Sequence, residues 1–138
     1  MNKELLITVK NDISEIARLS KIIEQFGENN NLSLKIIFDL NLALEEFLTN
    51  VIKYSYGDDR EHLISINISL VEDEIITVIE DDGNIFNPLE ISKPDIKKPP
   101  EERKIGGLGI HLVRNLFDQL KYERKNNKNI ISFIKKVS

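Results

Sequence analysis

Hydrophobic and polar residues alternate along this chain with two periods, one typical of helices and one typical of strands. Residues 4–9 form a first, short strand-like run. Asn11 or Asp12 is then placed to cap a helix, Glu15 completes a capping box after Asp12, and Gly27 with the polar run 28–31 is placed to end the helix. Apolar side chains three and four positions apart predict its buried face, which is made by Ile13, Ile16, Leu19, Ile23 and Phe26.

A second and longer helix follows, and it carries two polar residues of interest. Ser33 is a plausible cap, and the helical pattern runs to about Tyr56, where Gly57 and two aspartates interrupt it. Glu46 and Asn50 are four positions apart, so they lie on one face of this helix, one turn from each other. The apolar stripe that we expect to face the core consists of Ile37, Leu40, Leu44, Phe47 or Leu48, and Val51.

Four further segments have the alternation of strands. Residues 62–71 place their isoleucines at every second position, and the acidic turn 72–74 leads to a strand at 75–79. This strand ends in three carboxylates, at positions 80–82, and then in Gly83. The last two runs, 119–124 and 129–137, are joined by a segment whose Asn126-Asn127 pair suits a hairpin turn.

Between the two pairs of strands lies a long segment without periodicity. All four prolines fall between Pro88 and Pro100, and a helix is expected again at 108–116. The order β-α-α-β-β-loop-α-β-β predicts one domain over residues 1–138, of the α+β class. We expect a two-layer sandwich with three helices on one face of a mainly antiparallel or mixed sheet of about five strands.

Composition and charge remove several classes of protein. Of 138 residues, 41% are hydrophobic and 30% charged, as in ordinary globular domains, and the lack of cysteine excludes disulfides and thiolate metal sites. The apolar start is too short for a signal peptide, and no run approaches the roughly 18 residues of a membrane span, so we expect a cytoplasmic protein without membrane association.

The charge is unevenly distributed. Residues 41–82 hold eleven acids and two bases, whereas 121–138 hold six bases and one acid. A basic tail can indicate nucleic-acid binding. Here the bases alternate with apolar residues at strand spacing, without aromatic residues arranged for base stacking, so a solvated sheet face is favoured over direct nucleic-acid binding.

The candidate chemistry begins at residues 106–109, where three glycines precede a helix. The N–H groups and positive dipole end of such a helix form an anion site, although a plain glycine-rich turn has the same appearance. The phosphate loop of P-loop NTPases is excluded, because Ile110-His111 stands where that motif requires Lys-Ser/Thr. The dinucleotide-binding fingerprint is excluded as well, because Leu112 stands in place of its third glycine.

Three separated features suit a different nucleotide site. The amide oxygen of Asn50 can bind Mg²⁺, and Glu46 one turn earlier can accept a proton from an attacking hydroxyl or water. Asp81 at a strand end accepts hydrogen bonds when ionised, so it would bind the amine of adenine and repel the carbonyl of guanine. Gly83 and the glycines at 107 and 109 would leave room for the ligand and supply N–H donors.

These residues resemble the three motifs of the GHKL ATPase superfamily, in the right order and at the right spacing. The helix 41–54 resembles the N-box, Asp81-Asp82-Gly83-Asn84-Ile85-Phe86-Asn87-Pro88 the G1 box, and Gly106-Gly107-Leu108-Gly109 the G2 box. The short chain and the approach Glu-Glu-Arg-Lys-Ile-Gly-Gly-Leu-Gly-Ile-His-Leu-Val are similar to the small anti-sigma-factor serine kinases of bacteria.

The resemblance implies a histidine kinase-like ATP-binding fold and a role for each matching residue. Glu46 would be the general base, Asn50 the Mg²⁺ ligand and Asp81 the reader of adenine. The segment of about 87–106, which contains Arg103, would be the ATP lid. The further residues expected to bind the nucleotide are Lys53, Gly83, Phe86, Gly106, Gly107, Leu108 and Gly109.

The resemblance also implies partners. Such kinases form homodimers that hold a sigma factor and phosphorylate a serine of an anti-sigma-factor antagonist. A non-catalytic module of the same fold, which ATP or ADP would switch between partners, is the alternative. A detached histidine-kinase domain also stays open, although neither His62 nor His111 has the setting of a phosphoacceptor, and both are expected to be structural.

Three positions depart from the family pattern. Val51 stands where alanine is preferred, and Ile85 where larger relatives have glycine. Lys128-Asn129 replaces a late Gly-Thr pair, which leaves the details on the phosphate side open.

Overall fold

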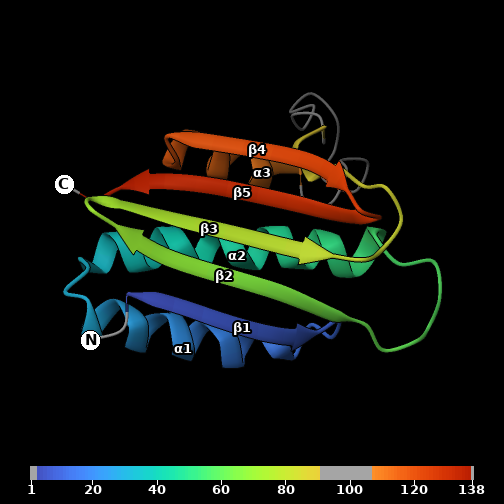
Figure 1. Cartoon of the computed structure of the whole chain (residues 1–138), viewed down its shortest axis with the longest axis horizontal. Coiled ribbons are helices and arrows are strands. Elements are labelled where there is room, and N and C mark those ends of the chain that lie inside the picture. Colours follow the sequence, from blue (N-terminus) through green and yellow to red (C-terminus); the bar gives the residue numbers. More distant parts are fainter. Residues whose placement is uncertain (1–2, 91–106, 138) are drawn as a thin grey trace.

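The computed structural model describes residues 3–90 and 107–137, which form two layers (Figure 1). All strand pairs are antiparallel, and the order across the sheet is β1-β2-β3-β5-β4. Figure 1 shows α1, α2 and α3 together behind the sheet. The elements are β1 Glu4–Lys10, α1 Glu15–Asn29, α2 Leu34–Tyr54, β2 Leu63–Val71, β3 Glu74–Asp81, the 3-10 turn η1 Pro88–Glu90, α3 Gly107–Leu116, β4 Gln119–Lys125 and β5 Lys128–Lys136.

The α+β class, the element order and the position of the helices on one face of the sheet are therefore confirmed. The sheet is entirely antiparallel rather than mixed, because β5 returns beside β3 in the opposite direction. Both hairpins have residues with positive φ at their turns. Asn126 and Asn127 have φ of 53° and 61°, as a two-residue hairpin turn requires, and Glu72 has φ of 57°.

The alternation along the strands builds the core. Ile75, Thr77, Ile79 and Asp81 of β3 are buried, so Asp81 points to the helix side of the sheet and not into a surface turn. Asn129 is the register partner of Asp81 on β5, and it is buried as well.

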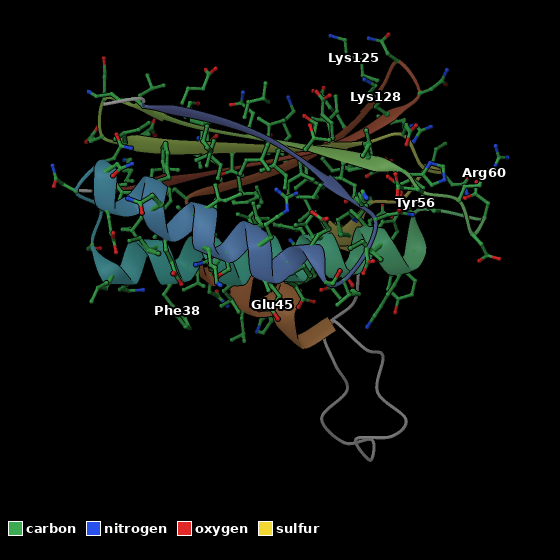
Figure 2. All side chains as sticks on the ribbon, turned by 90° about the horizontal axis from the view of Figure 1, so that it is seen from below. Phe38, Glu45, Tyr56, Arg60, Lys125 and Lys128 are labelled. Atoms are coloured by element: carbon green, nitrogen blue, oxygen red, sulfur yellow. The ribbon has the colours of Figure 1, made fainter. Side chains whose placement is uncertain are left out.

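Helix α2 occupies the middle of the helix layer and provides most of its buried surface. The hydroxyl of Ser33 accepts a hydrogen bond from Ile36 N at 3.2 Å, which confirms the predicted cap. All the predicted stripe positions are buried, among them Leu40, Leu44 and Phe47. Figure 2 shows the two layers edge-on, with Phe38 and Glu45 on the side of α2 that faces away from the sheet.

Two details predicted for the start of the first helix are wrong. Asp12 accepts a hydrogen bond from Ser14 N, and Glu15 pairs with Arg18, so no capping box forms. Ile13 is half-exposed because it precedes the helix. The predicted end of the helix within 27–31 is confirmed, because α1 ends at Asn29. Gly27 also serves close packing between two helices, since a Cβ atom on it would come within 2.5 Å of two side-chain carbons of Ile37.

The basic C-terminal strands are only partly a solvated face. Lys121, Lys125 and Lys128 are exposed, whereas Lys135 is half-buried and contacts Asp39 at 3.4 Å. Within residues 3–90 and 107–137, no helix combines the length and the apolar character needed to cross a membrane.

Candidate functional site

One end of the candidate site is built on α2. Asn50 is buried and Glu46 is partly buried, and the Asn50 amide nitrogen donates to Glu46 Oε1 at 3.3 Å. This contact leaves the amide oxygen of Asn50 without a hydrogen bond to any described residue. Burial raises the pKa of Glu46, the bond from Asn50 opposes the shift, and Glu45 and Lys53 contribute smaller effects of opposite sign. A carboxylate with a raised pKa is suited to accept a proton.

The start of α3 lies directly against this carboxylate. A Cβ atom built on Gly109 would come within 2.6 Å of all three atoms of the Glu46 carboxylate group, so only glycine leaves that group in its place. Glu46 and Gly109, from two motifs that are distant in the sequence, therefore share one site. Gly107 and Leu108 form the first turn of α3, and Gly106 lies outside the described residues.

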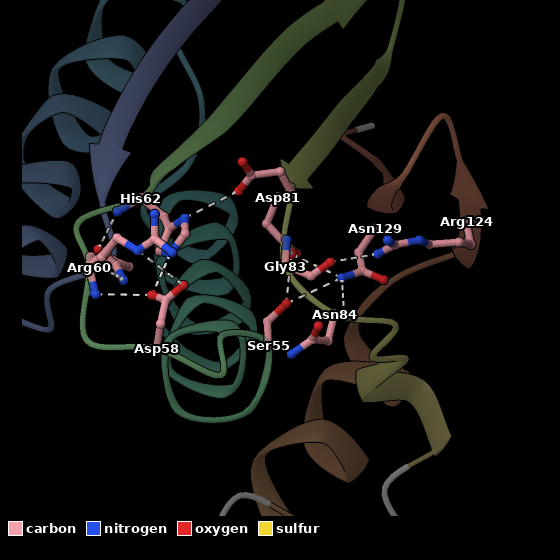
Figure 3. A network of polar contacts seen from close by, with 11 residues as sticks. Ser55, Asp58, Arg60, His62, Asp81, Gly83, Asn84, Arg124 and Asn129 are labelled. Atoms are coloured by element: carbon pink, nitrogen blue, oxygen red, sulfur yellow. Dashed lines mark hydrogen bonds and ion pairs between the residues drawn. The ribbon is translucent and has the colours of Figure 1, made fainter.

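The other end of the site is a buried carboxylate held by several donors (Figure 3). Asp81 is 3% exposed, and its Oδ1 accepts from the Ser55 hydroxyl at 2.6 Å and from Gly83 N at 2.9 Å. The third donor is Asn129 Nδ2, at 2.9 Å. Among the described residues, none donates a hydrogen bond to the second oxygen, Oδ2, which leaves it as an acceptor for a ligand.

Gly83 is required by close approach at the same place. A Cβ atom on it would come within 2.5 Å of the Ser55 hydroxyl and carbonyl oxygens. The loop is also held from the sheet, because Arg124 on β4 donates to the Gly83 carbonyl at 2.8 Å. The glycine of the G1-like motif is thus placed by packing against the end of α2.

Asn129 is a site residue that the sequence analysis did not select. It is 2% exposed and bonds to Asp81, to the hydroxyl of Ser55 at 3.2 Å and to the carbonyl of Asn84 at 2.7 Å. Its position was noted only as a departure from a Gly-Thr pair. Strand alternation gave a usable signal, because a polar residue on the inward face of β5 needs polar partners.

Phe86 and Lys53 are less closely tied to these groups. The Phe86 ring packs against Tyr54 with centroids 5.7 Å apart, and its backbone N–H donates to Asn129 at 3.1 Å. Lys53 is exposed in the last turn of α2, one turn beyond Asn50. At this position Lys53 can reach a ligand that lies against α2, but it does not contact Asp81.

His62 belongs to a separate cluster beside the site. Its ring stacks on Tyr56 at 4.2 Å, and its nitrogens lie 2.7 Å from Asp58 and 3.7 Å from Asp82. Burial, and then the acids around it, raise the pKa of Tyr56.

Residues 3–90 and 107–137 contain no cluster of three or more histidine and acidic side chains that could hold a metal by themselves. Mg²⁺ would therefore need ligand oxygens from elsewhere beside the Asn50 amide, as it does when it binds with phosphates.

Comparison with known proteins gives a consistent set of matches. A family model described as a histidine kinase-like ATPase domain matches residues 9–135. The serine-protein kinase RsbW of Listeria monocytogenes is 27% identical over 121 residues, which cover 85% of this chain and 76% of that protein. The anti-sigma F factor of Clostridium novyi is 26% identical over 140 residues, with 95% of this chain and 90% of that protein covered.

A solved structure has the same fold. The crystal structure of the RsbU and RsbW domains of a Mycobacterium tuberculosis protein superposes with a TM-score of 0.71 at 14% identity. The match covers 99% of this chain and 33% of the chain in that crystal structure.

Proposed function

Because this chain belongs to the histidine kinase-like ATPase domain family, we propose that it is an ATP-dependent protein serine kinase of the anti-sigma-factor type. The observation that carries the proposal is the position of Glu46, which lies beside Asn50 on α2 and directly against Gly109 of α3. The names of two similar proteins, a serine-protein kinase and an anti-sigma factor, support the same activity. One ATPase domain would cover residues 1–138, with a lid at about 87–106.

In the proposed complex the nucleotide lies between the two ends of the site. Asp81 Oδ2 accepts a hydrogen bond from the adenine amine, and the N–H groups at the start of α3 face the phosphates. The Asn50 amide oxygen is a suitable ligand for Mg²⁺, which neutralises phosphate charge when it is bound.

Glu46 then accepts the proton of the attacking serine hydroxyl. Phosphoryl transfer depends mainly on positioning and on charge stabilisation, so the group that receives the proton must be held in place. The hydrogen bond from Asn50 and the contact with Gly109 restrict the Glu46 carboxylate from two sides. Its raised pKa makes it a better proton acceptor than an exposed glutamate.

The partners follow from the similar proteins. We propose a sigma factor as the sequestered protein and an anti-sigma-factor antagonist as the phosphorylated one, with the kinase acting as a homodimer in the cytoplasm. Direct nucleic-acid binding is not part of the proposal, because the bases of β4 and β5 are divided between the exposed sheet face and internal contacts such as Arg124 to Gly83.

The first test is magnesium-dependent nucleotide binding. Calorimetry with ATP and Mg²⁺ should give binding by the native chain and a large loss for Asn50→Ala. Unchanged affinity in Asn50→Ala would remove Asn50 from the site.

The second test separates a kinase from a binding module. The chain is incubated with γ-labelled ATP and the candidate antagonist proteins of its genome, and label on serine should appear with the native chain and disappear with Glu46→Gln. Glu45→Gln is the matched control, because Glu45 is exposed on the outer side of the same helix. ATP binding without any label in the native reaction would identify a non-catalytic module that binds partners under nucleotide control.

A further inference from the structure

Asn129 uses both ends of its side-chain amide inside the candidate site. The nitrogen donates to Asp81 and to the carbonyl of Asn84, and the oxygen accepts from Phe86 N at 3.1 Å and from the Tyr122 hydroxyl at 2.6 Å. We propose that Asn129 is a positioning residue that sets the preference of the site for adenine over guanine by holding Asp81. The inference rests on the proposed function, since it requires that Asp81 faces the base.

The first step of the argument is the occupancy of the Asp81 carboxylate. All three donors, from Ser55, Gly83 and Asn129, converge on Oδ1. An oxygen with three donors has no capacity for a ligand, so the carboxylate presents Oδ2 alone.

The second step is that the amide of Asn129 has a single orientation. The backbone N–H of Phe86 can only donate, so the Asn129 oxygen must face it and the nitrogen must face Asp81. Tyr122 reinforces this choice, because burial raises the pKa of its hydroxyl and the group keeps its proton to donate. The Asn129 N–H group that donates to Asp81 is therefore held in place by the contacts of the oxygen at the other end of the same amide.

The third step concerns the loop that follows β3. Asn129 bonds to the carbonyl of Asn84 and the N–H of Phe86, so it joins this loop to β5 (Figure 3). Removing the side chain would take two hydrogen bonds from the loop and one of the three donors from the Asp81 carboxylate. Asp81 could then turn on its Cβ–Cγ bond or exchange its protein donor for water.

These contacts explain selectivity in chemical terms. An ionised carboxylate oxygen at a fixed place accepts from the amine of adenine and repels the carbonyl oxygen of guanine. If the carboxylate is free to rotate, the repulsion of guanine weakens, because the acceptor oxygen is no longer held opposite the guanine carbonyl. Asn129 would therefore affect the ratio of the two affinities and not only the affinity for ATP.

The experiment compares ATP and GTP affinities, measured by calorimetry with Mg²⁺, for the native chain and Asn129→Ala. We expect the ratio of the affinities to fall by about tenfold, in the range expected when a buried hydrogen bond is lost. Tyr122→Phe removes only the hydroxyl that orients the amide, and it should lower the ratio by roughly threefold. Asn67→Ala is the control, because Asn67 lies on β2 between inward isoleucines and faces the other side of the sheet.

The outcomes separate the inference from the proposed function. Circular dichroism and thermal melting identify the variants that fold. If Asn129→Ala does not fold, the ratio measured for Tyr122→Phe decides the question. The inference is overturned if each folded variant keeps the native ratio within twofold while the native chain prefers ATP. If the native chain binds neither nucleotide, the proposed function itself fails.

Discussion

Replacing Gly109 by alanine should separate catalysis from stability. The new Cβ atom would come within 2.6 Å of the three atoms of the Glu46 carboxylate group, whereas an ordinary contact of this kind is 3.4–4 Å. The end of the glutamate side chain is flexible, so it can retreat, by about 1 Å or more. A displacement of this size at a reacting group can lower the rate by about a hundredfold, which corresponds to about 2.7 kcal/mol of the barrier.

The effect of Gly109→Ala on folding should be small. Alanine is more favourable than glycine inside a helix by about 1 kcal/mol, and the displaced Glu46 loses a hydrogen bond from Asn50 worth about 1 kcal/mol. These contributions oppose each other. We expect the free energy of unfolding, measured in urea, to change by no more than about 1 kcal/mol.

The assay is single-turnover transfer of label from saturating ATP to the serine substrate, with a double-mutant cycle as the control. Glu46→Asp shortens the side chain by one methylene and leaves room for the new methyl group. Gly109→Ala should therefore cost much less in the Glu46→Asp background than in the native one. An equal cost in both backgrounds would show that contact with Glu46 is not the cause, and native activity in Gly109→Ala would refute the close approach itself.

Three further predictions concern α1, α2 and pH. Gly27→Ala should lower the free energy of unfolding by up to about 2 kcal/mol, because overpacking against Ile37 costs about 1–3 kcal/mol and alanine regains about 1 kcal/mol in helix propensity; a raised melting temperature would contradict this packing. Ser33→Ala should lose the cap to Ile36 and about 1 kcal/mol of unfolding free energy in urea, with Ser33→Asp close to native. Transfer activity should decline as pH falls through the raised pKa of Glu46, because only the ionised form accepts a proton. The midpoint should lie above that of an ordinary glutamate, and a profile without it would argue against Glu46 as the base.

Local patterns were sufficient for most of the fold. Alternation gave the strands, the spacing of three and four gave the helices, and Asn126-Asn127 gave the last hairpin. Gly27, with the polar run after it, marks the end of the first helix to within two residues. Its use in packing depends on Ile37 of the next helix, and no local pattern carries that information.

The candidate site was only partly predictable for the same reason. The spacing of Glu46 and Asn50 places them one turn apart on one face of a helix, so their proximity follows from the sequence alone. The contact of Gly109 with Glu46 and the bonds of Asn129 join segments that are distant in the chain. Motif matching indicated the first of these contacts. It missed the second because Asn129 stands where the family pattern has a different residue type.

Helix α2 relates the two ends of the site to each other. Glu46 and Asn50 lie within it, and Ser55, its C-cap residue, donates to Asp81. At a rise of 1.5 Å per residue, positions 46 and 55 are roughly 13 Å apart along the axis. This helix therefore sets the separation between the proton acceptor and the hydroxyl that holds Asp81. A change in the register of α2 would shift Glu46 and Ser55 together relative to Asp81 on β3, so the packing of Leu44, Phe47 and Val51 is a condition for the geometry of the whole site.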